Sequence, residues 1–400
     1  RTRSELLPYL TENAEDEDEI MVALAVELGN FTELVGGNAN ADCLLAPLEI
    51  LARVEETVVR EEASNSIRKL AATVGDPSSL PDLVARLANG DWFTARVSAC
   101  SLFGAVHQRM SDPEQQRELR GALEALCRDD TPMVRRAAAG WVGDFAAAVG
   151  DKVIVLDEVL NWFKGLCGDE QDNVRLIAVE ACPAFAALLD EGENLEHILP
   201  VIHAAVEDRS WRVRCSIAKK WAETATHMGA SCQNDDMLHG LATLLQDVEA
   251  EVRCAAVKNL GAFVQLVGEE GFVGELSPSL AMLAGDQAQN VRTALVEATM
   301  TLADVLPAQQ VEPQLIPLVL QFLNDEAPEV QLLVLRKFGI LASKVDLGTS
   351  ELLPAIQELA QDRLWRVREA FVVNMPAVAQ ALGSAYLEDN LLDLLLSAFN

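Results

Sequence analysis

The sequence predicts an all-α fold, a solenoid of stacked antiparallel helix pairs, on two observations. First, the stretch DRSWRVR at Asp208–Arg214 returns as DRLWRVR at Asp362–Arg368, and weaker copies keep the aspartate, a valine five residues later and then usually an arginine. Successive copies start 37 to 40 residues apart, a period typical of helical repeats. Second, apolar residues between the copies follow a helical period, and no useful β-alternation occurs. The aspartates that start the copies are Asp129, Asp169, Asp208, Asp247, Asp286, Asp325 and Asp362.

Extending this register backwards through Arg96, Arg60 and Met21 divides the chain into ten repeats of one continuous solenoid. The predicted repeats cover about residues 1–38, 39–76, 77–113, 114–152, 153–192, 193–231, 232–270, 271–309, 310–347 and 348–384, and 385–400 form the first helix of an eleventh. The chain begins inside one helical pattern and stops inside another. We therefore expect it to be a fragment of a longer solenoid.

Each repeat is expected to contain two helices. Around Asp208, one apolar stripe runs from Leu195 to Val206, a short turn follows, and a second helix is expected from Trp211 to about Met228. A proline recurs inside the first helix and predicts a kink, because it removes an amide donor. Two helices, a kink and this period favour HEAT repeats over armadillo repeats, which normally add a third short helix. The recurring prolines are Pro8, Pro47, Pro200, Pro278, Pro317 and Pro354.

The recurring arginine lies in the first turn of the second helix, where the helix dipole disfavours a positive charge. It therefore needs an anion, and the recurring aspartate is expected to cap the second helix and to pair with an arginine of its own or the adjacent repeat. Such pairs would form a ladder that fixes the stacking register, and direct contact with a partner is the alternative. Gln331 replaces the arginine after Asp325. The predicted ladder residues are Asp129, Arg135, Arg175, Asp208, Arg214, Asp247, Arg253, Asp286, Arg292, Asp362 and Arg368.

Charge and composition exclude several classes of function. The 62 acidic residues outnumber the 31 basic ones, so phosphate backbones are repelled and no nucleic-acid partner is expected. No apolar run is long enough for a membrane span, so no membrane partner is expected. The eight cysteines form no C-x-x-C pair and are interpreted as reduced core residues of a cytoplasmic protein. The five histidines lack metal-ligand spacing, and no nucleophile elbow or phosphate-binding loop occurs, so we expect no catalytic residue, metal or cofactor and no enzyme activity.

Strings at the turns resemble one family, the scaffolding A subunits of protein phosphatase 2A. They include VEETVVR at Val54–Arg60, GDWFTARVSAC at Gly90–Cys100 and DDTPMVRRAAA at Asp129–Ala139. RTRSELLP, DEDE, LVGG, DEQDNVRLIAVEAC and DRSWRVR complete the set, which lies in register along the whole chain. The general HEAT pattern is shared by many unrelated proteins, whereas these strings are specific.

The resemblance implies a right-handed, curved HEAT superhelix that acts as a non-catalytic scaffold of a heterotrimeric serine/threonine phosphatase, in the cytoplasm and also in the nucleus. In that family, regulatory B-type subunits dock on the turns of the N-terminal repeats, and the catalytic subunit docks on the C-terminal repeats. This chain would hold most of the regulatory-subunit half and only the start of the catalytic-subunit half. The resemblance thus implies both subunits as partners.

Turn residues are the candidates for these contacts, because stacking occupies the helix faces. Tryptophan beside arginine is typical of interface hot spots, with local packing as the alternative, and acidic turns either face solvent or meet basic partner residues. Trp141, Trp162 and Trp221 lie within helices and are interpreted as core or inter-helix packing. Predicted catalytic-subunit contacts are Trp365 and Arg366. Predicted regulatory-subunit contacts are Asp16, Glu17, Asp18, Glu19, Glu55, Glu56, Trp92, Phe93, Asp130, Thr131, Pro132, Met133, Arg136, Asp169, Glu170, Ser210, Trp211 and Arg212.

Two other functions fit the repeat type. A karyopherin-like transport receptor would bind basic partners through an acidic inner surface, which predicts acidic residues on the second helices. Here the acidic residues concentrate at the turns instead. A HEAT-repeat enzyme or nucleic-acid-processing protein would need a catalytic constellation or a basic groove, and the sequence provides neither.

Overall fold

The computed structural model describes residues 2–12, 17–229, 235–342, 344–345, 351–383, 388 and 392–397. Throughout these ranges the regular structure is helical, and no strand occurs in them. The chain divides into two compact units, Arg1–Asp190 and Glu191–Asn400, close to the predicted repeat boundary at residues 192 and 193. No helix in the described part of the chain is long and apolar enough to cross a membrane. The all-α class predicted from the repeat is confirmed.

The first unit begins with a π-helical turn, η1 (Thr2–Leu6), and consists of helices of varied length. Its remaining elements are α1 (Leu7–Glu12), α2 (Asp18–Leu28), η2 (Glu33–Val35), η3 (Asn38–Leu44), α3 (Leu45–Leu51), α4 (Thr57–Thr73), α5 (Leu80–Ala88), α6 (Phe93–Cys100), α7 (Phe103–His107), α8 (Pro113–Cys127), α9 (Pro132–Val149), α10 (Lys152–Ile154), η4 (Val155–Val159), α11 (Leu160–Cys167), α12 (Asp172–Val179) and α13 (Cys182–Leu188).

The second unit repeats the same plan with more continuous second helices. Its elements are α14 (Glu191–His197), α15 (Leu199–Val206), α16 (Trp211–His227), α17 (Asp235–Leu245), α18 (Ala250–Gly271), η6 (Phe272–Leu276), α19 (Ser277–Ala284), α20 (Gln289–Val305), α21 (Ala308–Leu323), α22 (Pro328–Ala342), α23 (Leu352–Leu359), α24 (Trp365–Leu382) and α26 (Leu392–Ser397).

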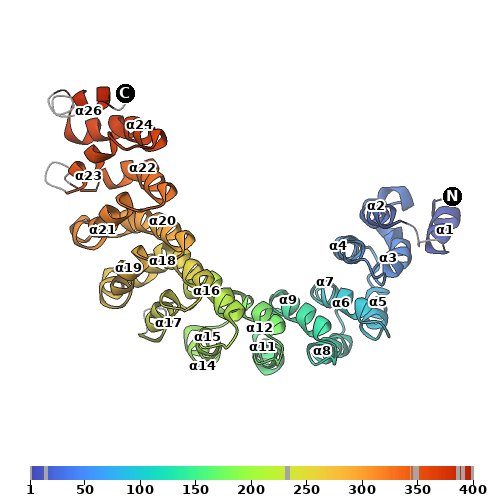
Figure 1. Ribbon diagram of the computed structural model, residues 1–400. Helices are drawn as coiled ribbons and strands as arrows, with labels where there is room; N and C mark the ends of the chain where they lie inside the picture. Colours follow the sequence, from blue (N-terminus) through green and yellow to red (C-terminus); the bar gives the residue numbers. More distant parts are fainter. Residues whose placement is uncertain are drawn as a thin grey trace. The chain divides into compact units, whose positions relative to one another are not determined.

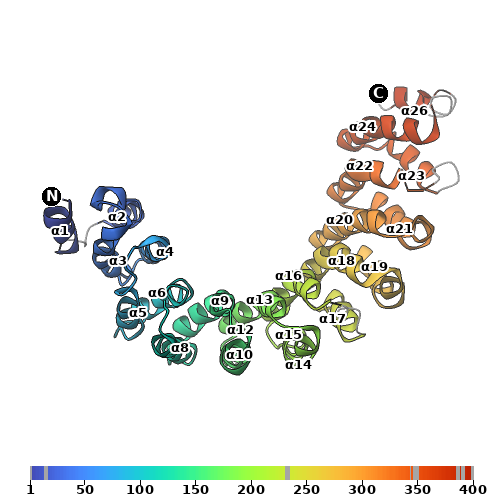
Figure 2. The same cartoon turned by 180° about the vertical axis from the view of Figure 1, so that it is seen from behind.

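Each unit has two layers of helices. In the second unit, α16, α18, α20, α22 and α24 pack side by side as one layer, and α15, α17, α19, α21 and α23 form the other (Figure 1). In the first unit, the second-helix layer runs from α2 through α4, α6 and α9 to α12, while α5, α8 and α11 follow one another in the first-helix layer (Figure 2). The turns between the two helices of each pair therefore lie along one edge of each unit.

The recurring prolines interrupt first helices more often than they kink them. Pro200 and Pro278 lie at the start of α15 and α19, each preceded by a separate helical segment. This position needs no amide donor, since the first amides of a helix have no intrahelical acceptor. By contrast, α21 continues through its prolines, Pro313 and Pro317. The predicted kink is thus realised as a one-residue interruption before α15 and as a π-helical segment, η6, that runs directly into α19.

Large aromatic residues fill the space between the layers. Trp221 of α16 is buried and meets Phe263 of α18 edge to face, with ring centroids 6.2 Å apart. Gly240 of α17 is required for this packing, because a Cβ atom there would lie 2.7 Å from the Trp221 ring. Trp162 is also buried, as expected. Trp141 is only half-buried and borders a cavity, so of the two interpretations it fits inter-helix packing, with its ring against Arg68 of α4.

Candidate functional site

The edge formed by the helix-connecting turns carries the arginine and aspartate residues of the ladder. Within each turn, the arginine reaches back to the backbone: Arg135 Nη1 donates to Asp129 O at 2.8 Å, and Arg214 Nη1 donates to Asp208 O at 2.8 Å. Arg175 and Arg368 make the same bond to the backbone oxygens six residues earlier. The arginine thus satisfies a backbone carbonyl oxygen of its own turn.

At five junctions within the units, the carboxylate that pairs with the arginine comes from the next repeat. Arg214 Nε and Nη2 donate to the two carboxylate oxygens of Asp247, at 2.5 and 2.9 Å, and Arg253 contacts Asp286 in the same way, at 2.6 and 2.8 Å. Of the two arrangements left open by the sequence, these junctions use the pairing between repeats. Two-pronged arginine–carboxylate pairs fix geometry as well as charge, so they hold each turn against its neighbour. The pairs within the units are Arg96–Asp129, Arg135–Asp169, Arg214–Asp247, Arg253–Asp286 and Arg292–Asp325.

The aspartate does not cap the second helix directly, contrary to the expectation. Its Oδ1 instead accepts the backbone N–H of the residue two positions later: Ser210 N–H contacts Asp208 at 2.8 Å, and Leu364 N–H contacts Asp362 at 2.7 Å. That later residue occupies the N-cap position, and its own side chain makes no cap hydrogen bond in either case. The carboxylate therefore stabilises the turn one step before the helix begins.

The ladder has clear electrostatic consequences. The hydrogen bonds that Arg214 donates to Asp247 and Arg253 donates to Asp286 raise the pKa of both guanidinium groups. Burial works to raise the pKa of Asp286, but the hydrogen bonds from Arg253 and from the Ala288 N–H outweigh it, and the pKa is lowered. Both partners of this pair are therefore held in their charged forms.

Asp169, which the sequence assigns to docking, lies in the ladder. The sequence groups Asp169 with Glu170 as a regulatory-subunit contact, but the Asp169 carboxylate is only 8% exposed and is held by Arg135. Glu170 is exposed and lies 3.5 Å from Arg135. Asp169 is thus a stacking residue, and only Glu170 of the two is accessible.

Sequence reasoning left several stacking residues out. Arg96 and Asp325 belong to the ladder, and the register marked both positions. A second set links the first-helix layer: Arg86 of α5 pairs with Glu49 of α3 at 2.6 Å, and Arg120 of α8 pairs with Glu158 of η4 at 2.8 Å. The paired residues are 37 and 38 residues apart in the sequence, which matches the repeat period and could have predicted both pairs.

The predicted docking aromatics are exposed. Trp92 is 76% exposed, Trp365 61%, Trp211 39% and Phe93 37%. The guanidinium of Arg212 lies 6.0 Å from the ring centroid of Trp211, and Arg366 lies 5.6 Å from that of Trp365. Each pair offers an apolar face and a cation, a combination common in interface hot spots.

Trp92 borders a groove of about 660 Å³ that crosses three successive turns of the first unit. Asp18 and Met21 come from the first turn, Glu55 and Glu56 from the second, and Trp92 from the third. Glu56 also caps α4, since its side chain accepts the Val58 N–H at 3.4 Å. Arg53, which the sequence did not single out, lines the same groove. The groove therefore combines exposed aromatic surface with acidic side chains.

The remaining predicted contacts lie at turns within each unit. Met133 is 47% exposed at the start of α9, and Asp130 and Arg136 lie on either side of it, whereas Thr131 and Pro132 are half-buried. Ser210 is the half-buried N-cap of α16. Glu17, Asp18 and Glu19 are exposed, and Asp16 lies outside the described residues.

A second groove, of about 410 Å³, lies beside Trp365 in the second unit. Its walls come from α22 and α24 and include Arg336, Glu369 and Val373, whose side chain is 69% exposed. Trp365 and Arg366 thus border a hollow that can receive a partner side chain.

The chain is similar in sequence to known proteins of one family. A family model described as the PPP2R1A-like HEAT repeat matches residues 231–307. The chain is 42% identical, over 343 residues, to the beta isoform of the human 65 kDa A-type regulatory subunit of serine/threonine-protein phosphatase 2A, a match that covers 83% of this chain and 56% of that protein. It is 49% identical over 204 residues to a probable PP2A regulatory subunit of Caenorhabditis elegans, covering 50% of this chain and 34% of that protein. The chain thus spans between about a third and just over half of these relatives.

Solved structures show the same fold at low identity. A Kap95p structure concerned with RanGDP superposes with a TM-score of 0.70 and 15% identity, over 100% of this chain and 57% of that one. An importin beta structure gives 0.67 and 14%, over 94% and 51%. At this identity the likeness concerns the helical solenoid fold alone.

Proposed function

Because the chain is homologous to the A-type regulatory subunits of serine/threonine-protein phosphatase 2A, we propose that it is a non-catalytic scaffold of that phosphatase. In this role it holds a regulatory B-type subunit next to a catalytic subunit. Tethering raises the effective concentration of a bound substrate at the phosphatase. The homology over most of the chain is the observation that carries the proposal. The chain itself supplies binding surfaces and no reacting group, in the cytoplasm and the nucleus.

The exposed turns support docking of the regulatory subunit on the first repeats. Aromatic side chains that are exposed beside cations or carboxylates contribute most when a partner covers them. Trp92 with its groove and Trp211 with Arg212 have this character. The acidic turn residues Asp18 and Glu55 complement basic residues of a regulatory subunit, and the exposed Glu170 does the same. The arginine–aspartate pairs of the ladder hold successive repeats together, so the aromatic side chains beside them are available for binding.

The catalytic subunit would dock near the C-terminal end of the chain. Trp365 and Arg366, with the groove beside α24, form the proposed start of its platform. Since the chain spans only part of its relatives, the rest of that platform lies in regions beyond it. We therefore expect this chain alone to hold the regulatory subunit more firmly than the catalytic subunit.

The competing proposal is a karyopherin-like transport receptor, whose fold the chain shares. That likeness carries 14–15% identity, against 42% to the phosphatase subunit. A direct test is to mix the purified chain with the catalytic subunit, with a B-type regulatory subunit or with a transport GTPase, and to separate complexes by gel filtration. The proposal predicts co-elution with the regulatory subunit. Co-elution with the GTPase in place of it would support the transport receptor.

A further inference from the structure

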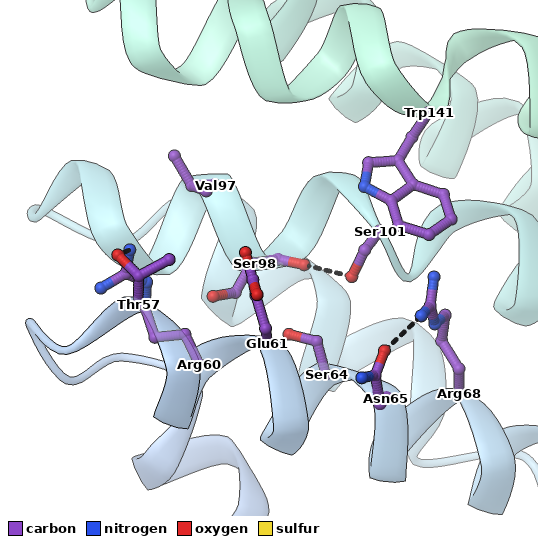
Figure 3. A pocket seen from close by; sticks show the side chains of 10 residues that line it. All are labelled: Thr57, Arg60, Glu61, Ser64, Asn65, Arg68, Val97, Ser98, Ser101 and Trp141. Atoms are coloured by element: carbon purple, nitrogen blue, oxygen red, sulfur yellow. Dashed lines mark hydrogen bonds between the residues drawn. The ribbon is translucent and has the colours of Figure 1, made fainter. Parts of the chain in front are cut away.

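A polar cavity of about 260 Å³ lies in the second-helix layer of the first unit (Figure 3). Its walls come from three successive second helices rather than from the docking turns. It is therefore separate from the grooves beside Trp92 and Trp365. Its lining includes Arg60, Ser64 and Arg68 of α4, Ser98 and Ser101 of the repeat between α4 and α9 (the middle repeat), and Trp141 of α9.

The cavity exists because the middle repeat has small side chains here. Ser64 and Ser98 are buried in its floor, and the second helix of the middle repeat is broken between α6 and α7. Arg68 crosses the gap, and its guanidinium lies 4.3 Å from the centroid of the Trp141 ring. Solenoid repeats normally contact only their neighbours, but this contact joins repeats on either side of a third. Arg68 and Trp141 thus form a wall across the open side.

Arg60, at the other end of the cavity, lacks its ladder carboxylate. It binds its own turn as the other ladder arginines do, with Nη1 donating to Val54 O at 2.9 Å. In the repeat after Arg60, Gly90 occupies the position that carries the aspartate in other repeats. The backbone shows this equivalence: Arg96 Nη1 donates to Gly90 O at 2.8 Å, as Arg135 Nη1 donates to Asp129 O. Arg60 Nε, which elsewhere meets that carboxylate, is buried without a hydrogen-bond partner among the described residues.

The two arginines leave positive charge in the cavity. In the described part of the chain, neither Arg60 nor Arg68 is within ion-pair distance of a carboxylate, and Arg68 instead donates to the amide oxygen of Asn65. Burial lowers the pKa of both guanidinium groups, against the opposing charges of Glu56 and Glu61 for Arg60 and of Asp144 for Arg68. Glu61, which also lines the cavity, and Asp144 are both exposed, so water screens both carboxylate charges. A buried guanidinium is most stable with an anion in direct contact.

We propose that this cavity binds one anionic side chain, a carboxylate or a phosphorylated residue, carried by a segment of a partner protein. Arg68, whose guanidinium lies beside the Trp141 ring, presents its N–H groups to the anion. The Ser64 hydroxyl, which forms no hydrogen bond with other described residues, donates a further one. Ser98 and Ser101 already donate to backbone oxygens, at 3.2 and 2.9 Å, so they accept N–H groups of the incoming segment. The volume suits one side chain rather than a folded domain.

The test uses three capped tripeptides, Gly-Glu-Gly, Gly-phosphoSer-Gly and Gly-Gln-Gly, and the whole chain. Binding is measured by ligand-observed NMR titration. The site predicts that the glutamyl and phosphoseryl peptides bind and that the glutaminyl peptide binds at least fivefold more weakly. Binding of the phosphoseryl peptide alone also supports the site and identifies phosphate as its ligand. Equal binding of all three peptides would overturn the proposal.

Variants connect this binding to the cavity. Arg68→Gln is expected to weaken binding of the anionic peptides at least fivefold, while Arg117→Gln, which removes an exposed guanidinium paired with Glu114 on α8, leaves it unchanged. Ser101→Leu fills the cavity without altering its charge and is expected to abolish binding, which provides a second test if Arg68→Gln does not fold. Unchanged binding in the folded Arg68→Gln or Ser101→Leu variant would refute the assignment.

Discussion

The Asp247 carboxylate links two repeats at once, because it accepts Nε and Nη2 of Arg214 from the preceding helix pair while its Oδ1 accepts the Glu249 N–H of its own turn, at 2.9 Å. The aspartate therefore cannot move with one repeat alone. Since the same unit recurs along both halves of the chain, stacking depends on a row of nearly identical, largely buried ion pairs.

Removing one partner of such a pair should destabilise the chain strongly. In Arg253→Met, the Asp286 carboxylate keeps only its own turn's N–H, and we expect the free energy of unfolding to fall by about 3 kcal/mol. Urea unfolding followed by circular dichroism measures this loss. The control is Arg117→Met, since the Arg117–Glu114 pair is exposed on both sides and screened by water, so its loss should change the free energy of unfolding much less. Equal effects of the two substitutions would contradict the structural role of the ladder.

The ladder has a gap where Gln331 replaces arginine. Gln331 donates to Leu323 O within its own repeat, so Asp362 of the next repeat receives no arginine from this position. Gln331→Arg should restore the pair and raise the free energy of unfolding by roughly 1 kcal/mol. It should also slow hydrogen exchange in α22 and α24. Gln331→Met is the control, and an equal gain from methionine would show that the charge is irrelevant.

Acid should weaken the ladder. The native pKa of Asp286 lies below its unfolded value of about 4, so this group stabilises the fold above that pH and loses the contribution as pH falls through the native pKa. The urea midpoint of the native sequence should therefore drop between about pH 6 and pH 3. In Asp286→Asn, which starts from a lower midpoint, the drop should be smaller. Parallel curves for the two proteins would argue against this assignment.

Buried cysteines should resist modification. Burial raises the pKa of Cys127 and Cys182 to about 12 and that of Cys100 well above its usual value. At about pH 8 we expect iodoacetamide to label these three thiols only after unfolding in urea, because the thiolate is the reactive form. Mass spectrometry of the labelled peptides gives the answer. Rapid labelling of Cys182 in the folded chain would show that this core opens.

The repeat period made much of this structure predictable. It located the second helices, as α16 at Trp211–His227 shows, and it located the arginines and aspartates of the ladder. It did not determine which repeat supplies each carboxylate, because spacing along the chain allows both choices until the helices are stacked. The pairing of Asp169 with Arg135 was missed for that reason.

Other features depended on neighbours in space. The helical pattern of α9 predicts a core position for Trp141, but small serines in the intervening repeat leave it beside a cavity, under Arg68. No pattern within α9 contains that information. Similarly, the prolines predicted a local disturbance, and only packing decided between a continuous α21 and a break before α15.

The central claim, that the turns form a docking edge, is tested most directly by the affinity of the chain for a purified B-type regulatory subunit, measured by surface plasmon resonance. Trp211→Ala combined with Arg212→Ala removes an exposed pair and leaves the Arg214–Asp247 link intact. We predict binding at least about tenfold weaker, whereas Trp365→Ala with Arg366→Ala keeps the native affinity. Native affinity in a folded Trp211→Ala, Arg212→Ala chain would contradict the claim.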